Sequence, residues 1–189
     1  MQDKIRACIA ESIAVQQAVL DKNLAVIEKT AQAVIAALKN GGKILLCGNG
    51  GSAADCQHIA AELIGRFQKE RKSLPAIALT TDTSILTSLA NDYSFDIIFS
   101  RQLEGLGKKG DVLVGISTSG NSPNVVKAVE QANKMGIKTI AMTGRDGGML
   151  ARIADIAIVV PSAKTARIQE SHVALLHAVC EVVEDELAK

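Results

Sequence analysis

The sequence is poor in aromatic residues, which make up only 2% of its 189 residues and include no tryptophan. Proteins that bind single-stranded nucleic acids stack bases on aromatic side chains, so we expect no such platform here. Charge offers no alternative, because the formal net charge of +1 gives no electrostatic attraction to a nucleic acid or an anionic membrane. We therefore expect neither direct nucleic-acid binding nor membrane association.

Long apolar runs are also missing. No segment approaches the roughly 18 apolar residues that a membrane-spanning helix needs. The N-terminal residues, MQDKIRACIAESI, mix charged and apolar side chains at helical spacing and do not resemble a signal peptide. The four cysteines, Cys8, Cys47, Cys56 and Cys180, form no CxxC pair, which favours free thiols in a reducing compartment. These absences together predict a cytoplasmic protein.

What the sequence does contain is an alternation of short apolar runs and amphipathic stretches. Five runs rich in valine and isoleucine are expected to be strands, at residues 43–48, 75–80, 111–117, 138–144 and 156–161. Such runs suit strands that are buried on both faces. Helical periodicity is clearest in residues 53–65, 123–135 and 166–188. The alternation predicts an α/β fold, a three-layer doubly wound sheet of about five parallel strands.

Residues 1–40 are expected to form one or two helices ahead of the first strand. Their apolar stripe needs a partner surface, either the chain's own sheet or another subunit, and consists of Ile5, Ile9, Ile13, Leu24, Ile27, Val34 and Leu38. No internal repeat, low-complexity tract or linker interrupts the sequence. We therefore predict one domain over residues 1–189, with a helical arm at 1–40 and an α/β core with a C-terminal helix at 41–189.

Small polar loops follow four of the predicted strands, with the sequences GNGGS, TTDTS, STSGNSP and TGRDGG. In a parallel sheet ligands bind at the carboxyl ends of the strands, so the chemistry is expected at this edge. The first loop nearly matches a dinucleotide fingerprint, but its only nearby acid, Asp82, lies 34 residues after Gly48 instead of about 20. A glycine-rich turn with Ser52 as the helix cap is the simpler interpretation.

The third polar loop, STSGNSP, favours a phosphate site. It places four hydroxyls within six positions, on Ser117, Thr118, Ser119 and Ser122. Ser122 is positioned to cap the next helix, with Pro123 as the first helical residue. Hydroxyls and a helix N-terminus bind phosphate without a lysine. The alternative is a serine-rich turn with a capped helix, and the other polar loops at the same edge favour phosphate.

His58 and Glu62 are one helical turn apart and face the same direction. Such a pair can be a surface hydrogen bond, so a metal site needs further donors. Gln169, Glu170, His172 and His177 interrupt the apolar face of the final predicted helix and provide candidates. Glu170 could equally be solvated, and His172 could be an ordinary helix histidine. Cys56 lies about 200° around the helix from His58 and is interpreted as a buried thiol.

Gln169 and His177 are eight residues apart, which is about 12 Å along a straight helix. One ion could hardly bind both side chains directly from the same straight helix. Either the segment around Gln169 is not helical, or the site draws on two subunits. We favour two subunits, because the N-terminal helices also predict an oligomer interface.

Several of these segments closely resemble bacterial phosphoheptose isomerases, a family of the sugar-isomerase (SIS), flavodoxin-like fold. The matching segments are CGNGGSAADCQHIAAEL, LANDYSFDIIFSRQ, GDVLVGISTSGNSPNV, TGRDGG and ARIQESH with the later histidine. GISTSGNS is typical of the whole SIS class, whereas His58, Glu62, Gln169 and His177 together are specific to the heptose enzymes. The resemblance runs over essentially the whole chain.

The resemblance implies conversion of D-sedoheptulose 7-phosphate to D-glycero-D-manno-heptose 7-phosphate, the first step towards the ADP-heptose of lipopolysaccharide. It implies a homotetramer with sites at subunit interfaces and one zinc ion per site, held by His58, Glu62, Gln169 and His177. The reaction passes through an enediol, for which Glu62 suits the base and His177 the partner acid/base. The substrate-binding positions that it implies are Asn49, Gly50, Gly51, Ser52, Glu62, Asn91, Asp92, Ser117, Thr118, Ser119, Ser122 and Gln169.

Two other segments, MQDKIRACIAESI and RFQKERKSLPAIALTTD, also resemble an SIS protein that associates with the bacterial replication initiator. That protein is a binding module, and its group lacks the glutamate and the histidine that match Glu62 and His177. Because this sequence has both, the enzyme is favoured. Some isomerases carry an acid where this chain has Ala166, so no catalytic role of that acid transfers here.

Overall fold

The five valine- and isoleucine-rich runs form the strands of one parallel sheet in the computed structural model, which describes residues 1–188. The strands are β1 (Ile44–Gly48), β2 (Ala76–Ala78), β3 (Val112–Ser117), β4 (Lys138–Gly144) and β5 (Ile156–Val160). Every residue of β1 and β3 is buried, as expected for strands covered on both faces. The strand order is β2-β1-β3-β4-β5, with all pairs parallel. The predicted fold class is confirmed.

The three predicted helices are present within a few residues, as α2 (Gly51–Ile64), α5 (Pro123–Lys134) and α7 (Thr165–Leu187). The structure adds elements that periodicity did not predict. They are the helices α3 (Thr83–Asp92), α4 (Ser100–Leu106) and α6 (Leu150–Ile153) and the short 3-10 helix η1 (Phe95–Ile97). The N-terminal segment is one helix, α1 (Gln2–Lys39). None of the described helices is long and apolar enough to span a membrane.

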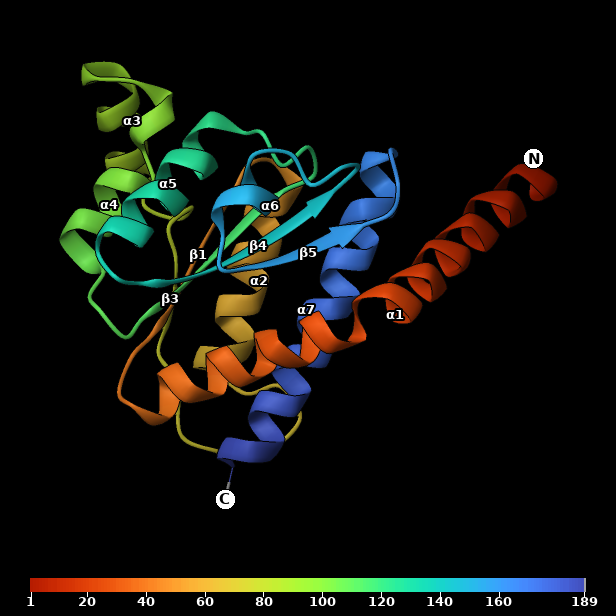
Figure 1. Ribbon diagram of the computed structural model, residues 1–189, viewed down its shortest axis with the longest axis horizontal. Coiled ribbons are helices and arrows are strands. Elements are labelled where there is room, and N and C mark those ends of the chain that lie inside the picture. The colour runs from red at the N-terminus through yellow and green to blue at the C-terminus, as the bar shows by residue number, and fades with distance from the viewer. Residues whose placement is uncertain (189) are drawn as a thin grey trace.

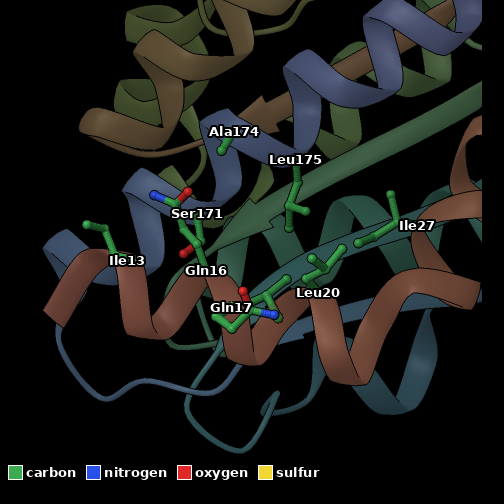
Figure 2. A pocket seen from close by; sticks show the side chains of 9 residues that line it. Ile13, Gln16, Gln17, Leu20, Ile27, Ser171, Ala174 and Leu175 are labelled. Carbon is green, nitrogen blue, oxygen red and sulfur yellow. The ribbon is translucent and has the colours of Figure 1, made fainter. Parts of the chain in front are cut away.

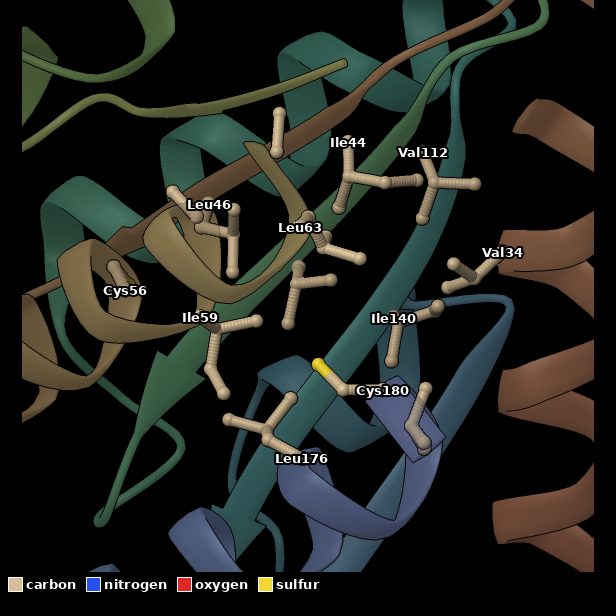
Figure 3. Close-up of a cluster of buried hydrophobic side chains, with 14 of the residues drawn as sticks. Val34, Ile44, Leu46, Cys56, Ile59, Leu63, Val112, Ile140, Leu176 and Cys180 are labelled. Atoms are coloured by element: carbon tan, nitrogen blue, oxygen red, sulfur yellow. The ribbon is translucent and has the colours of Figure 1, made fainter. Parts of the chain in front are cut away.

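The helices cover the two faces of the sheet in separate layers (Figure 1). One face packs against α1, α2 and α7, and Figure 3 shows Leu46, Ile140, Ile59 and Cys180 in this core cluster. The opposite face packs against α4, α5 and α6 through the alternate strand residues, such as Leu113. The two-residue period of the strands therefore supplies both cores. Helices α2 and α7 lie on the same face and contact each other.

The N-terminal turns of α1, as far as Ile13, do not pack on the core, whereas Val19 is buried beside Val160 and Ile168. Val34 is buried with the sheet cluster, whereas Ile5, Ile9 and Ile13 are 54%, 57% and 64% exposed. Figure 1 shows this N-terminal half projecting away from the rest of the chain. Where the helix passes α7, the two helices line a groove that includes Ile13 and Leu175 (Figure 2). The apolar stripe of α1 therefore packs against the core of its own chain along only part of its length.

The strand order reverses direction between β1 and β3, which are adjacent in the sheet. Chain segments leaving the carboxyl ends of these two strands turn to opposite faces, because α2 lies on one face and α5 on the other. A crevice at such a switch point is the usual ligand site of an open parallel sheet. The loops GNGGS and STSGNSP both begin there.

Candidate active site

The loop after β1 turns sharply into α2. Gly50 occupies the N-cap position with φ 56°, in the left-handed region that glycine adopts at little cost. The helix begins at Gly51, so Ser52 lies inside its first turn and is buried. The prediction that Ser52 caps this helix is wrong, since no side chain caps it. The glycine turn lets the helix start before the serine.

Asn49, in the same loop, is joined to Asn124 at the start of α5. The two side-chain amides exchange hydrogen bonds, each 2.8 Å long. Asn124 is almost fully buried and also accepts the backbone N–H of Val125 at 3.0 Å. Sequence analysis did not identify Asn124, although an asparagine in the first turn of a helix at a ligand edge is a usable signal. This pair joins the two sides of the switch point.

The serine loop after β3 gathers its hydroxyls as predicted. Ser117 Oγ lies 2.8 Å from Ser122 Oγ and 3.4 Å from Ser119 Oγ, and Thr118 is half-buried between them in sequence. Ser122 occupies the N-cap position of α5 with Pro123 next, which confirms the predicted helix start. Its hydroxyl bonds to Ser117 and makes no capping bond to the helix backbone. The loop therefore presents hydroxyls beside the N-terminus of a 12-residue helix.

Helices α2 and α7 bring His58, Glu62 and His177 together. His58 Nε2 lies 3.1 Å from Glu62 Oε1 and 3.4 Å from His177 Nε2. The two imidazole rings meet edge to face, with centroids 4.9 Å apart and planes at 80°. One ligand atom from each of the three residues lies within 4.8 Å of the other two. The predicted same-face pair and the predicted later histidine thus form one cluster.

This donor set fits a zinc ion. Zinc in proteins takes imidazole nitrogens and carboxylate oxygens at about 2.0–2.2 Å, and tetrahedral ligands at that bond length lie about 3.4 Å from one another. The separations of 3.1 Å and 3.4 Å in the cluster match that spacing. Half-buried Glu62 and His177 and exposed His58 leave the cluster open to a small molecule, as a catalytic metal site requires.

Burial changes the pKa values of two side chains near the cluster on α2, Asp55 and Cys56. Burial raises the pKa of the Asp55 carboxyl, while the nearby His58 lowers it in part. Its Oδ2 is buried and has no hydrogen-bond partner among the described residues. Cys56 is fully buried, and burial raises the pKa of its thiol well above the ordinary value. The interpretation of Cys56 as a buried thiol is confirmed.

Gln169 packs against the N-terminal end of α2. A Cβ atom added to Gly51 would come within 2.7 Å of Gln169 Nε2, so the amide packs directly against this glycine. Thr165–Leu187 is one continuous helix, which excludes a non-helical segment at Gln169. Asn91 and Asp92 lie at the exposed end of α3, where Asn91 donates to the Asp92 carboxylate at 2.8 Å. Among the described residues, no hydrogen bond joins these two to the serine loop.

His172 lies on the side of α7 that faces the interior of the protein. It is fully buried, and its Nε2 lies 3.0 Å from the carbonyl oxygen of Thr143 at the end of β4. Burial lowers the pKa of His172 to about 4, although the bond to the Thr143 carbonyl opposes the shift. The histidine is therefore neutral near pH 7 and belongs to the packing of α7 against β4 rather than to the cluster.

Known proteins resemble this chain over most of its length. The SIS domain family model matches residues 8–144. The phosphoheptose isomerase of Nitratiruptor sp. is 62% identical over 151 residues, 80% of this chain and 81% of that protein. The phosphoheptose isomerase of Aquifex aeolicus is 55% identical over 185 residues, 98% of this chain and 97% of that protein. A solved phosphoheptose isomerase structure from Neisseria gonorrhoeae matches with a TM-score of 0.93 and 49% identity, covering 97% of this chain and 98% of that chain.

Proposed function

Because this chain belongs to the phosphoheptose isomerase family, we propose that it converts D-sedoheptulose 7-phosphate to D-glycero-D-manno-heptose 7-phosphate. The observation that carries this proposal is the cluster of His58, Glu62 and His177 on α2 and α7. We further propose that the reaction takes place in the cytoplasm and is the first step towards the ADP-heptose of lipopolysaccharide.

The reaction moves a carbonyl from C2 to C1 of the sugar. A proton leaves C1 and returns at C2, and the intermediate is an enediol. Glu62 is proposed as the base that takes the C1 proton, since a carboxylate within reach of the carbon suits this abstraction. His177 is proposed to exchange protons with the oxygens, because an imidazole donates and accepts protons near neutral pH. Their positions on neighbouring helices support this division of roles.

We propose that His58, Glu62 and His177 also hold one zinc ion per active site. When bound, zinc supplies a Lewis acid that polarises the carbonyl and stabilises negative charge on its oxygen. Glu62 would then serve both as a ligand and as the base, and a ligand carboxylate that also takes the proton would have to bind the ion loosely. Gln169 is proposed as the fourth ligand from a second subunit, since α7 is one continuous helix and Gln169 packs against Gly51 in its own chain.

The sugar phosphate is proposed to bind along the switch point, with its phosphate at the serine loop. The gathered hydroxyls and the N-terminus of α5 support this placement. The remaining sugar oxygens are proposed to contact polar groups of the other loops. The proposed substrate-binding residues are Asn49, Gly50, Gly51, Ser52, Glu62, Asn91, Asp92, Ser117, Thr118, Ser119, Ser122 and Gln169.

We propose that the chain forms a homotetramer with active sites at subunit interfaces. The exposed half of α1 supports this, because contiguous apolar side chains on a helix face are unfavourable in water unless covered. The groove between α1 and α7 continues that surface towards the half of α7 that carries Gln169 (Figure 2). The occupant that we propose is a second copy of this chain. The single-domain description, with residues 1–40 as an oligomerising arm, belongs to the same proposal.

The test follows sedoheptulose 7-phosphate by NMR with the purified protein and the isosteric variant Glu62→Gln. We expect wild-type turnover and a loss of about 100-fold or more in kcat for the variant, because the base is removed. Glu70→Gln is the matched control, since Glu70 is 92% exposed and pairs only loosely with Arg66 at 3.9 Å. Undiminished activity of Glu62→Gln would refute the base assignment. An inactive wild type that retains the replication initiator in a pull-down would instead favour the binding module.

A further inference from the structure

A buried ion pair joins α7 to the loop that follows α2, beyond the histidine cluster. Arg71 Nε lies 3.0 Å from Glu184 Oε1, and the two side chains are only 3% and 2% exposed. Neither residue takes part in the proposed chemistry. Buried charges cost free energy unless they are well compensated, so a pair this enclosed needs a structural reason.

Glu184 organises the loop that connects α2 to β2, which has no helix or strand over residues 65–75. Its Oε1 accepts the backbone N–H of Phe67 at 2.9 Å, and its Oε2 accepts those of Gln68 and Lys69 at 2.7 Å and 2.8 Å. Burial alone would raise the pKa of Glu184, but these three N–H groups and the charge of Arg71 lower it below the ordinary value. The carboxylate is therefore ionised and holds three consecutive backbone groups.

Arg71 binds the other side of the same junction, the C-terminal end of α2. Its Nη2 donates to the backbone carbonyl of Glu62 at 2.8 Å, and its Nη1 donates to those of Leu63 at 2.9 Å and Gly65 at 3.2 Å. The last carbonyls of a helix lack partners within the helix, and a cation there is also favoured by the helix dipole. Arg71 thus fixes the backbone of a cluster residue, Glu62, and joins it to Glu184 on α7.

Phe67 connects this loop to His177. Its ring lies 5.4 Å from the His177 ring, centroid to centroid, with the planes tilted by 31°. Glu184 holds the Phe67 backbone and follows His177 by seven residues, two turns along the same face of α7. The imidazole of His177 therefore contacts both the Phe67 ring and the ring of His58.

We propose that Arg71, Glu184 and Phe67 are positioning residues for the reaction centre. The ion pair locks the end of α2 to α7, and the Phe67 ring holds His177 in the orientation that brings its Nε2 to 3.4 Å from His58 Nε2. None of the three belongs to the donor set of His58, Glu62 and His177. The inference rests on the proposed function, because it assigns these residues to the alignment of the same cluster.

The test measures the Zn²⁺ dissociation constant of the full-length protein by competition with a chromophoric chelator, together with kcat, KM and the thermal midpoint. Groups that orient metal ligands are worth about 10–100-fold in metal affinity or activity. We expect Glu184→Gln and Arg71→Lys each to weaken Zn²⁺ binding and to lower kcat by about tenfold or more, with KM changed by less than about threefold. Phe67→Leu should show the same losses. Phe67→Tyr, which keeps the ring, should have the Zn²⁺ affinity and kcat of the wild type.

Asp111→Asn is the matched control. Asp111 is also a fully buried carboxylate that accepts two backbone N–H groups, from Lys43 and Lys108, and pairs with the Lys43 ammonium at 2.6 Å. It lies directly before β3, and its hydrogen-bond partners, Lys43 and Lys108, are outside the cluster. We expect a lower thermal midpoint in this variant, with unchanged Zn²⁺ affinity and kcat.

Wild-type Zn²⁺ affinity and kcat in a folded Glu184→Gln protein would overturn the inference, as would an equal loss in Asp111→Asn. If the ion-pair variants do not fold, Phe67→Leu decides the question, because it removes no backbone hydrogen bond. A wild type that binds Zn²⁺ but does not isomerise the heptulose phosphate would refute the proposed function alone. In that case the Zn²⁺ affinities of the variants still decide the positioning role.

Discussion

Asn49 and Asn124 exchange two side-chain hydrogen bonds of 2.8 Å between the loop that follows β1 and the first turn of α5. The two strands that lead to these residues, β1 and β3, are neighbours at the point where the strand order reverses. One amide pair therefore sets the separation of the glycine loop and the serine loop, the two segments proposed to contact the sugar phosphate.

Replacing Asn124 with leucine should disturb both stability and substrate binding. The substitution leaves the Asn49 amide without its partner, which costs about 1–3 kcal/mol when the group is buried. We expect a lower free energy of unfolding in urea and a raised KM, because Asn49 is free to move. Asn133→Leu is the control, since Asn133 donates to the Ile153 carbonyl at the opposite end of α5. It should lose stability with KM unchanged, and a raised KM in the control would contradict the assignment.

Gly51→Ala should impair the reaction through Gln169. The new methyl group would lie 2.7 Å from Gln169 Nε2, so the amide must move away. Small displacements of positioning groups are costly in catalysis, and we expect kcat/KM to fall by about tenfold or more. Gly105→Ala is the control, because nothing lies within 4 Å of its Cβ position inside α4. It should gain about 0.5–1 kcal/mol of stability without loss of activity. Full activity in Gly51→Ala would contradict the proposed substrate contact of Gln169.

We expect His172 to lower the free energy of unfolding in mild acid. Burial lowers its pKa from 6.5 to about 4 in the folded protein, so between these values the unfolded chain binds a proton that the folded chain does not. The free energy of unfolding therefore falls as the pH drops through this window, by about 3 kcal/mol from this residue. His172→Gln keeps an N–H donor for Thr143 and should lose that part of the pH dependence. Urea denaturation at pH 7 and pH 4.5 measures the free energy of unfolding of both proteins. An equal fall in this free energy for the wild type and for His172→Gln would contradict the prediction.

The proposed tetramer depends on the exposed face of α1. Ile9 is 57% exposed, and a buried glutamate at that position would be an unpaired charge in the interface. We expect Ile9→Glu to shift the mass measured by sedimentation from tetramer to smaller species. Leu106→Glu serves as the control, because Leu106 is 42% exposed at the end of α4, on the opposite side of the sheet. A monomeric wild type, or an Ile9→Glu protein of wild-type mass, would refute the interface.

The sheet could be predicted from sequence because strands covered on both faces are nearly continuous apolar runs, as residues 44–47 and 112–116 are. The helix α3 was not predicted, since it is short and buries no residue fully, although Leu86 and Leu89 pack partly buried against the core. The one- or two-helix prediction for residues 1–40 resolves as a single helix because Val34 and Ile9 share it without a break.

The cluster of the candidate site was predictable where local spacing fixes geometry. His58 and Glu62 share a helix face by periodicity, and His177 joins them as the resemblance implied. The resemblance to phosphoheptose isomerases is itself confirmed by the relatives. Arg71 and Glu184 were missed because charged residues in a loop and on a long helix usually face water, and only the tertiary packing brings them together. The ligand role of Gln169, the domain division and the tetramer stay predictions.

The most direct test of the central claim is NMR of sedoheptulose 7-phosphate isomerisation before and after metal removal. The purified protein is stripped with a chelator, its zinc content is measured, and zinc is then added back. We expect that turnover falls with the zinc content, returns on addition of zinc to the wild type, and does not return in His58→Gln. Full turnover by protein whose zinc has been removed would contradict it.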